Sequence, residues 1–163
     1  MSFIPQNFRP WYSGVRKLKS SLGIMEISFG HPNYNDEWKE ARAYQEFKIA
    51  GKPKWLNLVK KGKMVKYDKS GALKIANTEA GPPVKFNSLV KSKRENFHRV
   101  INSGQVELPI IAKYSHGFKI CIAGNTTFTG QMFMFKEVWV LEYYVPDEIS
   151  DLADLPKSFW RRK

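Results

Sequence analysis

The spacing of apolar and polar residues predicts short strands and helices along the first half of the chain. Residues 24–29 alternate in the manner of a strand, and a glycine, a histidine and a proline end this run. Apolar residues recur every three positions over 35–50, which predicts a helix that begins at an asparagine N-cap. A second short helix is expected over 53–62, where proline occupies a favoured first position. Residues 63–83 have little periodicity and two turn clusters, so we expect a long exposed loop there.

The second half of the chain has the clearer pattern. A helix is expected over 85–103, followed by strands over 106–113 and 118–123. A glycine turn then precedes a helix over 128–136, and a last strand is expected over 137–145. Strand, turn, helix and strand in this order form a compact unit of supersecondary structure.

The length of 163 residues, of which 42% are hydrophobic, suits a single packed domain. The fold class that we expect is α+β, with a small mixed sheet in the C-terminal half and helices in the N-terminal half. We assign a basic extension to 1–23, one domain to 24–146 and a polar tail to 147–163.

The chain is strongly basic, with 27 Lys and Arg against 15 Asp and Glu and a net charge of +12. Residues 1–23 contain no acid, and residues 48–74 contain nine lysines and one aspartate. Such an excess favours a polyanionic partner such as nucleic acid, a nucleotide or an acidic surface. The candidate nucleic-acid-binding residues are Lys52, Lys54, Lys60, Lys61, Lys63, Lys66, Arg94 and Arg99. The alternative is a solvated lysine-rich surface that only keeps the protein soluble.

What the sequence lacks excludes several classes of function. One cysteine permits no internal disulfide framework, and Cys121, between two isoleucines, is expected to be a buried thiol. No apolar run is long enough to span a membrane and no signal-peptide core follows Met1, so we expect a cytoplasmic protein without a membrane partner. The chain has no P-loop, no Gly-x-Gly-x-x-Gly and no Gly-x-Ser-x-Gly motif, and its three histidines show no metal-binding spacing. We therefore predict no metal-ligating residues.

The strongest candidate for chemistry is the run Ala123-Gly124-Asn125-Thr126-Thr127. A glycine that follows a strand permits a tight turn and the close approach of a ligand. Asn125 and Thr126 can cap the next helix, whose first N–H groups remain available to an anion such as phosphate. The alternative is that these residues only cap the helix, and the local chemistry leaves both open.

The run ELPIIAKYSHGFKICIAGNTTFTG, residues 107–130, resembles the core of ParB/sulfiredoxin-type domains, particularly ParB-like proteins of bacteriophages. In that family a hydrophobic Pro-Ile strand and a hairpin precede a Gly-x-x-Arg turn, frequently Gly-Asn-Thr-Arg, that opens a helix. The resemblance extends over 106–145, and the matching positions are Glu107, Pro109, Ile110, Gly117, Gly124, Asn125 and Thr126. It implies a ParB-like core that binds phosphate at Gly124, Asn125, Thr126 and Thr127. The cofactor stays open; a nucleotide, with or without Mg²⁺, fits the family, and a phage protein would act in the host cytoplasm.

The sequence departs from this family at one position that matters for chemistry. Thr127 stands where the family has arginine, and no basic residue follows until Lys136. Arginine binds a phosphate through two parallel hydrogen bonds, which threonine cannot reproduce. Either another cation, from residues 48–74 or from Arg94 and Arg99, supplies the charge, or the pocket has lost its reaction. The resemblance therefore supports the fold more than it supports an activity.

Two functions compete at this point. The first is a ParB-like phosphate- or nucleotide-binding domain that acts on or alongside nucleic acid, in the DNA metabolism or modification of a phage. Whether it is an enzyme is left open; if it is, we expect phosphoryl or nucleotidyl transfer or hydrolysis. Glu107 is then the candidate general acid or base, and the alternative for it is an ordinary solvent-facing strand residue. The second function is a non-enzymatic basic protein on a degenerate fold that binds DNA or RNA, or that inhibits a host defence protein.

Overall fold

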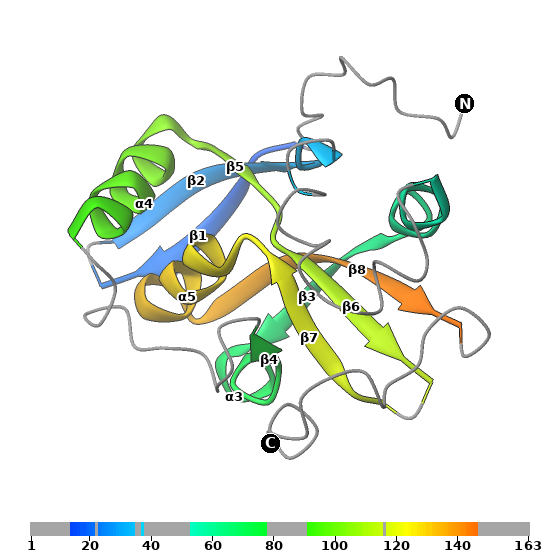
Figure 1. The fold of residues 1–163 in the computed structure, drawn as a ribbon. Coiled ribbons are helices and arrows are strands. Elements are labelled where there is room, and N and C mark those ends of the chain that lie inside the picture. The colour runs from blue at the N-terminus through cyan, green and yellow to red at the C-terminus, as the bar shows by residue number, and fades with distance from the viewer. Residues whose placement is uncertain are drawn as a thin grey trace.

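The computed structural model describes residues 14–21, 23–34, 37, 53–77, 91–115 and 117–146, and their fold is mixed α+β (Figure 1). The strands of these residues form two mixed sheets, one of three strands and one of five. The α+β class expected from the sequence is therefore confirmed. Some sequence predictions lie outside the described residues: those for 1–13, 38–52, 78–90 and 147–163, and those for Asn35, Asp36 and His116.

The three-stranded sheet has the order β1-β2-β5. β1 (Arg16–Ser20) and β2 (Gly23–Gly30) form an antiparallel hairpin, and β5 (Gln105–Glu107) runs parallel to β2. The strand predicted over 24–29 is confirmed as β2. β1 was not predicted, because Leu18 is the one fully buried residue in a strand that is otherwise basic or polar.

The five-stranded sheet has the order β3-β8-β6-β7-β4. Its strands are β3 (Lys63–Asp68), β8 (Glu137–Val145), β6 (Ile110–Tyr114), β7 (Lys119–Ala123) and β4 (Ala76–Asn77). β8 has the bounds that the sequence predicted, and it pairs antiparallel with β3 and parallel with β6. The predicted succession of strand, glycine turn, helix and strand is confirmed, since the helix α5 (Asn125–Met134) joins β7 to β8.

The long exposed loop predicted over 63–83 is wrong for the described residues of that segment. They form β3, the short helix α3 (Lys69–Ala72) and β4. β3 pairs with β8 along six positions, from Lys63 opposite Glu142 to Asp68 opposite Glu137. This partner lies about seventy residues further along the chain, so the local pattern could not reveal it. The described N-terminal half therefore contributes strands to both sheets, whereas we expected it to be mostly helical with one strand.

The strand predicted over 106–113 is in fact two strands, because Leu108 and Pro109 separate β5 from β6. Proline has no N–H for a ladder bond, and the chain passes at this point from one sheet to the other. The link is bound to both sheets. The Leu108 N–H donates to the carbonyl of Gly30 (2.9 Å), and the carbonyl of Pro109 accepts from the N–H of Leu141 (2.8 Å). The end of β5 is thereby held beside the start of β6.

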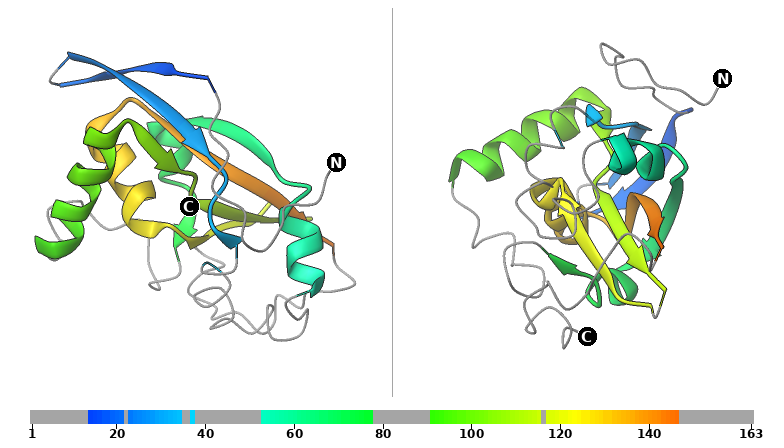
Figure 2. Two further views of the ribbon diagram at one scale, coloured as in Figure 1. Left: turned by 90° about the horizontal axis from the view of Figure 1, so that it is seen from above. Right: turned by 45° about the vertical axis from the view of Figure 1, so that its right-hand side comes forward.

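Helices occupy opposite ends of the described fold. α4 (Lys91–Ser103) and α5 lie side by side at one end, and the helical residues 53–59 lie at the other (Figure 2). The two helices approach closely at Gly130, where a Cβ atom would lie 2.4 Å from ring carbons of Phe97. A residue larger than glycine would therefore separate α4 from α5.

The helix predicted over 53–62 is confirmed over 53–59. Its Trp55 is fully buried, and the indole N–H donates to the hydroxyl of Tyr143 on β8 (3.1 Å). This tryptophan therefore anchors the helix to the five-stranded sheet and is not available to stack on a ligand.

Each face of the five-stranded sheet packs against a hydrophobic cluster, because neighbouring strand residues point to opposite sides. The larger cluster contains Ile110, Trp55 and Phe29, and so joins the two sheets. The smaller cluster contains Ile111 and Cys121 and lies against α5. Cys121 is fully buried, as predicted.

A single glutamine continues the pairing of β8 at the position that lies before the start of β6. Pairing between β6 and β8 begins at Leu141, so Trp139 has no β6 residue opposite it. The side chain of Gln131, on α5, takes that place: its amide NH₂ donates to the carbonyl of Trp139 (2.9 Å), and its oxygen accepts from the N–H of Trp139 (2.8 Å). Gln131 is fully buried, so these two bonds satisfy polar groups that are shielded from water.

Candidate functional site

A pocket of about 240 Å³ lies where α4, β5 and α5 meet. The residues that line it are Pro32, Glu37, Val100, Gln105, Glu107, Leu108, Gly124 and Thr127. Three of the five phosphate-site and catalytic residues predicted from the sequence, Glu107, Gly124 and Thr127, are therefore brought to one place. Asn125 and Thr126 are half-buried in the first turn of α5 but do not line this pocket.

Gly124 forms one wall of the pocket, and two observations explain why glycine occupies this position. Its φ angle of 78° is left-handed, which glycine adopts without strain. A Cβ atom here would also lie 2.9 Å from Cα of Pro109, so the turn packs directly on the link between the sheets. The chain consequently turns from β7 into α5 within one residue.

α5 begins one turn earlier than the predicted helix over 128–136, with Gly124 as its N-cap. Asn125 and Thr126 are thus helical residues and not the N-cap that the sequence suggested. Glycine has no side chain with which to accept a hydrogen bond from the helix start, and α5 has no side-chain cap at this residue. The first turn of the helix reaches the pocket at Thr127, and the N–H groups of a helix start favour an anion nearby.

Glu107 is the last residue of β5 and pairs in register with Gly30. It is exposed, and its Oε1 accepts a hydrogen bond from the backbone N–H of Asn33 (3.2 Å). That bond connects β5 to residues 31–34, and the N–H of Glu37 in turn donates to the carbonyl of Asn33 (3.0 Å). The two carboxylate residues are thereby drawn to the same pocket.

Glu37 was not among the predicted site residues. In the sequence it appears only as an acid in the first turn of a predicted helix, which is a common position for an acid in any helix. Its place in the pocket follows from the backbone bonds of Asn33, which link residues more than seventy positions apart. No local pattern would have singled it out.

The pocket is acidic, because Glu37 and Glu107 line it and none of the residues that line it is basic. A bare phosphate in the pocket would be repelled by these two carboxylates. Two carboxylates do suit Mg²⁺, which commonly takes one or two carboxylate ligands and obtains the rest from substrate phosphates and water. Within the described part of the chain, no group of three or more His, Cys, Asp or Glu side chains could hold a metal ion by itself. A divalent ion would therefore arrive together with a phosphorylated ligand.

His31 lies next to the pocket residue Pro32 but carries no positive charge into it. Its Nδ1 is hydrogen-bonded to the hydroxyl of Tyr34 (2.6 Å). Burial lowers the pKa of His31, so its ring is neutral at pH 7. Burial likewise raises the pKa of Tyr34, which keeps that hydroxyl protonated.

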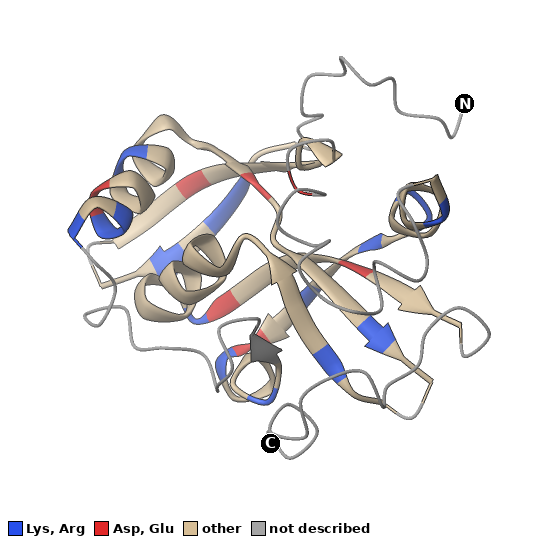
Figure 3. Ribbon diagram, in the orientation of Figure 1, with Lys and Arg blue, Asp and Glu red and all other residues tan. Residues whose placement is uncertain are grey.

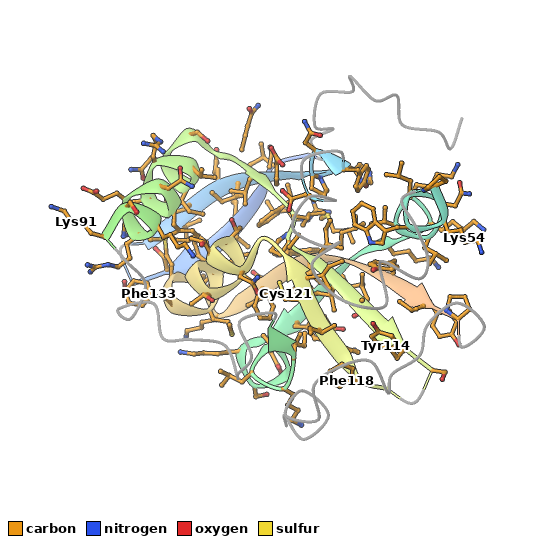
Figure 4. The ribbon with its side chains drawn as sticks, in the orientation of Figure 1. Lys54, Lys91, Tyr114, Phe118, Cys121 and Phe133 are labelled. Carbon is orange, nitrogen blue, oxygen red and sulfur yellow. The ribbon has the colours of Figure 1, made fainter. Side chains whose placement is uncertain are left out.

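The predicted cations do not supply the charge that Thr127 lacks. None of the described ones lines the pocket, and Lys52 lies outside the described residues. Lysines of residues 53–61 lie at the end of the molecule opposite α4, as the labelled Lys54 and Lys91 show (Figure 3, Figure 4). Lys63 and Lys66 belong to β3, where Lys66 pairs with Glu137 (3.8 Å), whereas Arg94 and Arg99 belong to α4. The predicted nucleic-acid-binding residues thus occupy separate elements.

The fold and the pocket together define an α+β domain with two carboxylates beside the start of a helix. No protein-family model, no curated protein and no solved structure matches the chain. The likeness to ParB/sulfiredoxin-type domains accordingly stays a prediction. In the described part of the chain, no helix has both the length and the apolar character needed to cross a membrane.

Proposed function

We propose that this protein is a nucleotide-binding domain of the ParB/sulfiredoxin kind, and that it holds the phosphates of its ligand at the start of α5. The observation that carries the proposal is the single pocket lined by Glu107, Gly124 and Thr127. These residues were selected from the sequence on chemical grounds, and the β6–β7 hairpin separates Glu107 from the other two along the chain. Their convergence on one pocket is what a phosphate site requires.

Each element of the pocket has a distinct part in this binding. The first N–H groups of α5 and the Thr127 hydroxyl donate hydrogen bonds to phosphate oxygens. Gly124 lets the chain turn tightly against Pro109, which brings the start of α5 to the pocket. Glu37 fits one ligand position of a Mg²⁺ ion, which when bound would neutralise charge on the phosphates, and Glu107 lines the same pocket. In the family that the sequence resembles an arginine binds the phosphate directly, whereas in this pocket a cation held by the acidic lining would bind it.

Glu107 is the residue that we assign as general base if the protein is a hydrolase. Its carboxylate would take a proton from a water molecule as the water oxygen bonds to phosphorus and the bond to the leaving oxygen breaks. The hydrogen bond from the Asn33 N–H to Oε1 holds this carboxylate beside the pocket. A protein that binds nucleotide without turnover would use the same pocket with Glu107 only as a positioning residue.

The proposal is tested by calorimetry with the four ribonucleoside triphosphates, each with and without Mg²⁺. We expect heat with at least one of them and only with Mg²⁺ present. Thr127→Ala removes one hydrogen bond to a charged group and should weaken binding about tenfold. Thr126→Ala changes the neighbouring threonine of the same helix turn, outside the pocket, and should leave the affinity unchanged. Absence of heat with every nucleotide, or equal losses in the two variants, would contradict the proposal.

A second observation favours action alongside nucleic acid. α4 carries Lys91, Lys93, Arg94 and Arg99, and its residue Val100 lines the pocket. A nucleic-acid backbone bound to α4 would therefore end beside the proposed phosphate site. The basic residues of α4 also support the non-enzymatic alternative, in which the protein only binds DNA or RNA.

Filter binding to double-stranded DNA over a salt series tests the role of α4. A triple variant, with Lys91, Lys93 and Arg99 changed to glutamine, should show a shallower dependence of log affinity on log salt, by about one unit for each DNA phosphate that the variant no longer neutralises. The matched control changes Lys54, Lys60 and Lys61 to glutamine, which removes the same charge at the opposite end. Equal effects of the two triple variants would show that only net charge matters.

A further inference from the structure

A second and larger hollow, a groove of about 740 Å³, lies between the β1–β2 hairpin and the end of α5. Its apolar lining comes from Ile24, Met132, Phe133, Met134 and Phe135, and its basic lining from Lys19, Lys69 and Lys136. It shares no lining residue with the proposed phosphate pocket, which lies at the start of α5. Figure 4 shows the labelled Phe133 at the outer side of α5.

The apolar part of this groove is exposed to an unusual degree. Ile24 is 65% exposed and Phe133 is 53% exposed, and both belong to the few large hydrophobic residues that the described surface leaves uncovered. They come from different elements, β2 and α5, yet they line the same groove. Exposed apolar side chains that gather in a hollow with a polar rim are typical of interaction sites.

The rim of the groove is uniformly basic. Lys19 comes from β1, Lys69 from α3 and Lys136 from the short link between α5 and β8, so lysines from three separate segments line the same hollow. Among the residues that line the groove there is no Asp or Glu. The charge complement of this rim is an acidic occupant, whose carboxylates would face the lysines while its apolar side chains entered the groove.

The wall formed by the hairpin is tied to the wall formed by α5. Ser20, the last residue of β1, makes an isolated antiparallel bridge with Phe135, which directly follows α5. Phe135 is buried, so the base of the groove is part of the packed core. The groove therefore has a defined shape before any partner binds.

We propose that this groove binds an acidic segment of a partner protein, with aliphatic or aromatic side chains of that segment seated against Phe133 and Ile24. A peptide suits the lining better than single-stranded nucleic acid does. Sites that bind unpaired bases present successive aromatic rings on which the bases stack, whereas this groove exposes one ring among isoleucine and methionine side chains. Methionine side chains adapt their shape and are common where peptide side chains are bound.

A library of random 12-residue peptides displayed on phage, selected against the full chain, tests this proposal. We expect the enriched peptides to carry several Asp or Glu together with Leu, Ile, Phe or Trp. An enriched peptide is then synthesised with a fluorescein label, and its affinity is measured by fluorescence polarisation. Enrichment of basic or neutral polar peptides would overturn the proposal.

Two pairs of matched variants locate the binding site. Phe133→Ser should weaken the peptide at least tenfold, and Tyr144→Ser, which removes another half-exposed ring at the far end of β8, should not change its affinity. A triple variant with Lys19, Lys69 and Lys136 changed to glutamine should also weaken the peptide about tenfold and reduce the salt dependence of its binding. The control triple, in which Lys54, Lys60 and Lys61 become glutamine, should not.

Two further results would refute the assignment. If the peptide keeps its affinity in both groove variants while circular dichroism shows them folded, the peptide binds elsewhere and the groove is not its site. If a labelled 20-nucleotide oligo(dT) displaces the peptide and loses at least tenfold affinity in Phe133→Ser, the groove is a stacking site for nucleic acid. The nucleotide calorimetry at the other pocket is unaffected by either result, because the two sites share no residue.

Discussion

Replacing Gln131 by alanine should destabilise the protein by about 2–6 kcal/mol. The figure follows from the two hydrogen bonds between the Gln131 side chain and the backbone of Trp139. Gln131 is fully buried, so its loss leaves one N–H and one C=O without a partner and removes packed atoms as well. Each unsatisfied group is worth about 1–3 kcal/mol, and a small domain has only about 5–15 kcal/mol of total stability.

Urea denaturation followed by tryptophan fluorescence measures this effect, with Asn102→Ala on the exposed face of α4 as a control that should change stability by less than about 0.5 kcal/mol. A loss of less than about 1 kcal/mol in Gln131→Ala would refute the account, because water would then be satisfying the Trp139 backbone.

Gln131→Glu separates hydrogen bonding from packing, since the side chain keeps its shape. An ionised carboxylate accepts from the Trp139 N–H but cannot donate to the Trp139 carbonyl, and its charge is buried. Burial raises the pKa of such a glutamate above its usual value of about 4.3 in the folded protein. The stability of Gln131→Glu should therefore be greatest at low pH, where the protonated carboxyl can donate, and should fall as the pH rises through the raised pKa. A flat difference from the natural protein between about pH 4 and pH 8 would contradict this reasoning.

Two other predictions concern single contacts. Gly130→Ala should destabilise the protein by about 1–3 kcal/mol in thermal unfolding, because the new methyl group would lie 2.4 Å from the Phe97 ring. Phe97→Leu in the same chain should recover part of this loss. If the stability changes of the two substitutions simply add in the double variant, the two residues are not in contact. Asp68 accepts a hydrogen bond from the backbone N–H of Gly71 (2.7 Å), and that bond lowers the pKa of Asp68 below its usual value of 3.8. Its contribution to stability is thus present above pH 3.8 and lost as the pH falls through the lowered pKa, a dependence that Asp68→Asn should abolish when acid unfolding is compared.

The parts of the fold that were predicted correctly are those in which adjacent residues carry the signal. β8 is rich in valine and aromatic residues over nine positions, and Gly124 marks the turn before α5, so both were found. β1 and β3 were missed because their lysines obscure the alternation and their partners determine that they are strands. Their stability comes from tertiary pairing, which no window of adjacent residues contains.

The candidate site shows the same division. Gly124 and Thr127 belong to one short motif, and Glu107 lies just before the strand that leads to it, so reasoning from the sequence reached all three. Glu37 lies at the pocket because Asn33 forms hydrogen bonds with both Glu37 and Glu107. Without Glu37 the acidity of the pocket could not be predicted. Because the pocket is acidic and has no arginine, we expect a phosphate to bind there only together with a cation.

The position of β8 between β3 and β6 has a consequence for how the chain is made. Its neighbours on either side, β3 and β6, both precede it in the sequence, and β8 is the last described strand to leave the ribosome. Until then the five-stranded sheet is split into two pieces, and the facing edges of β3 and β6 have no strand between them. Open edges of this kind are where nascent chains aggregate, so a ribosome that stalls before residue 145 would release a fragment in need of chaperones.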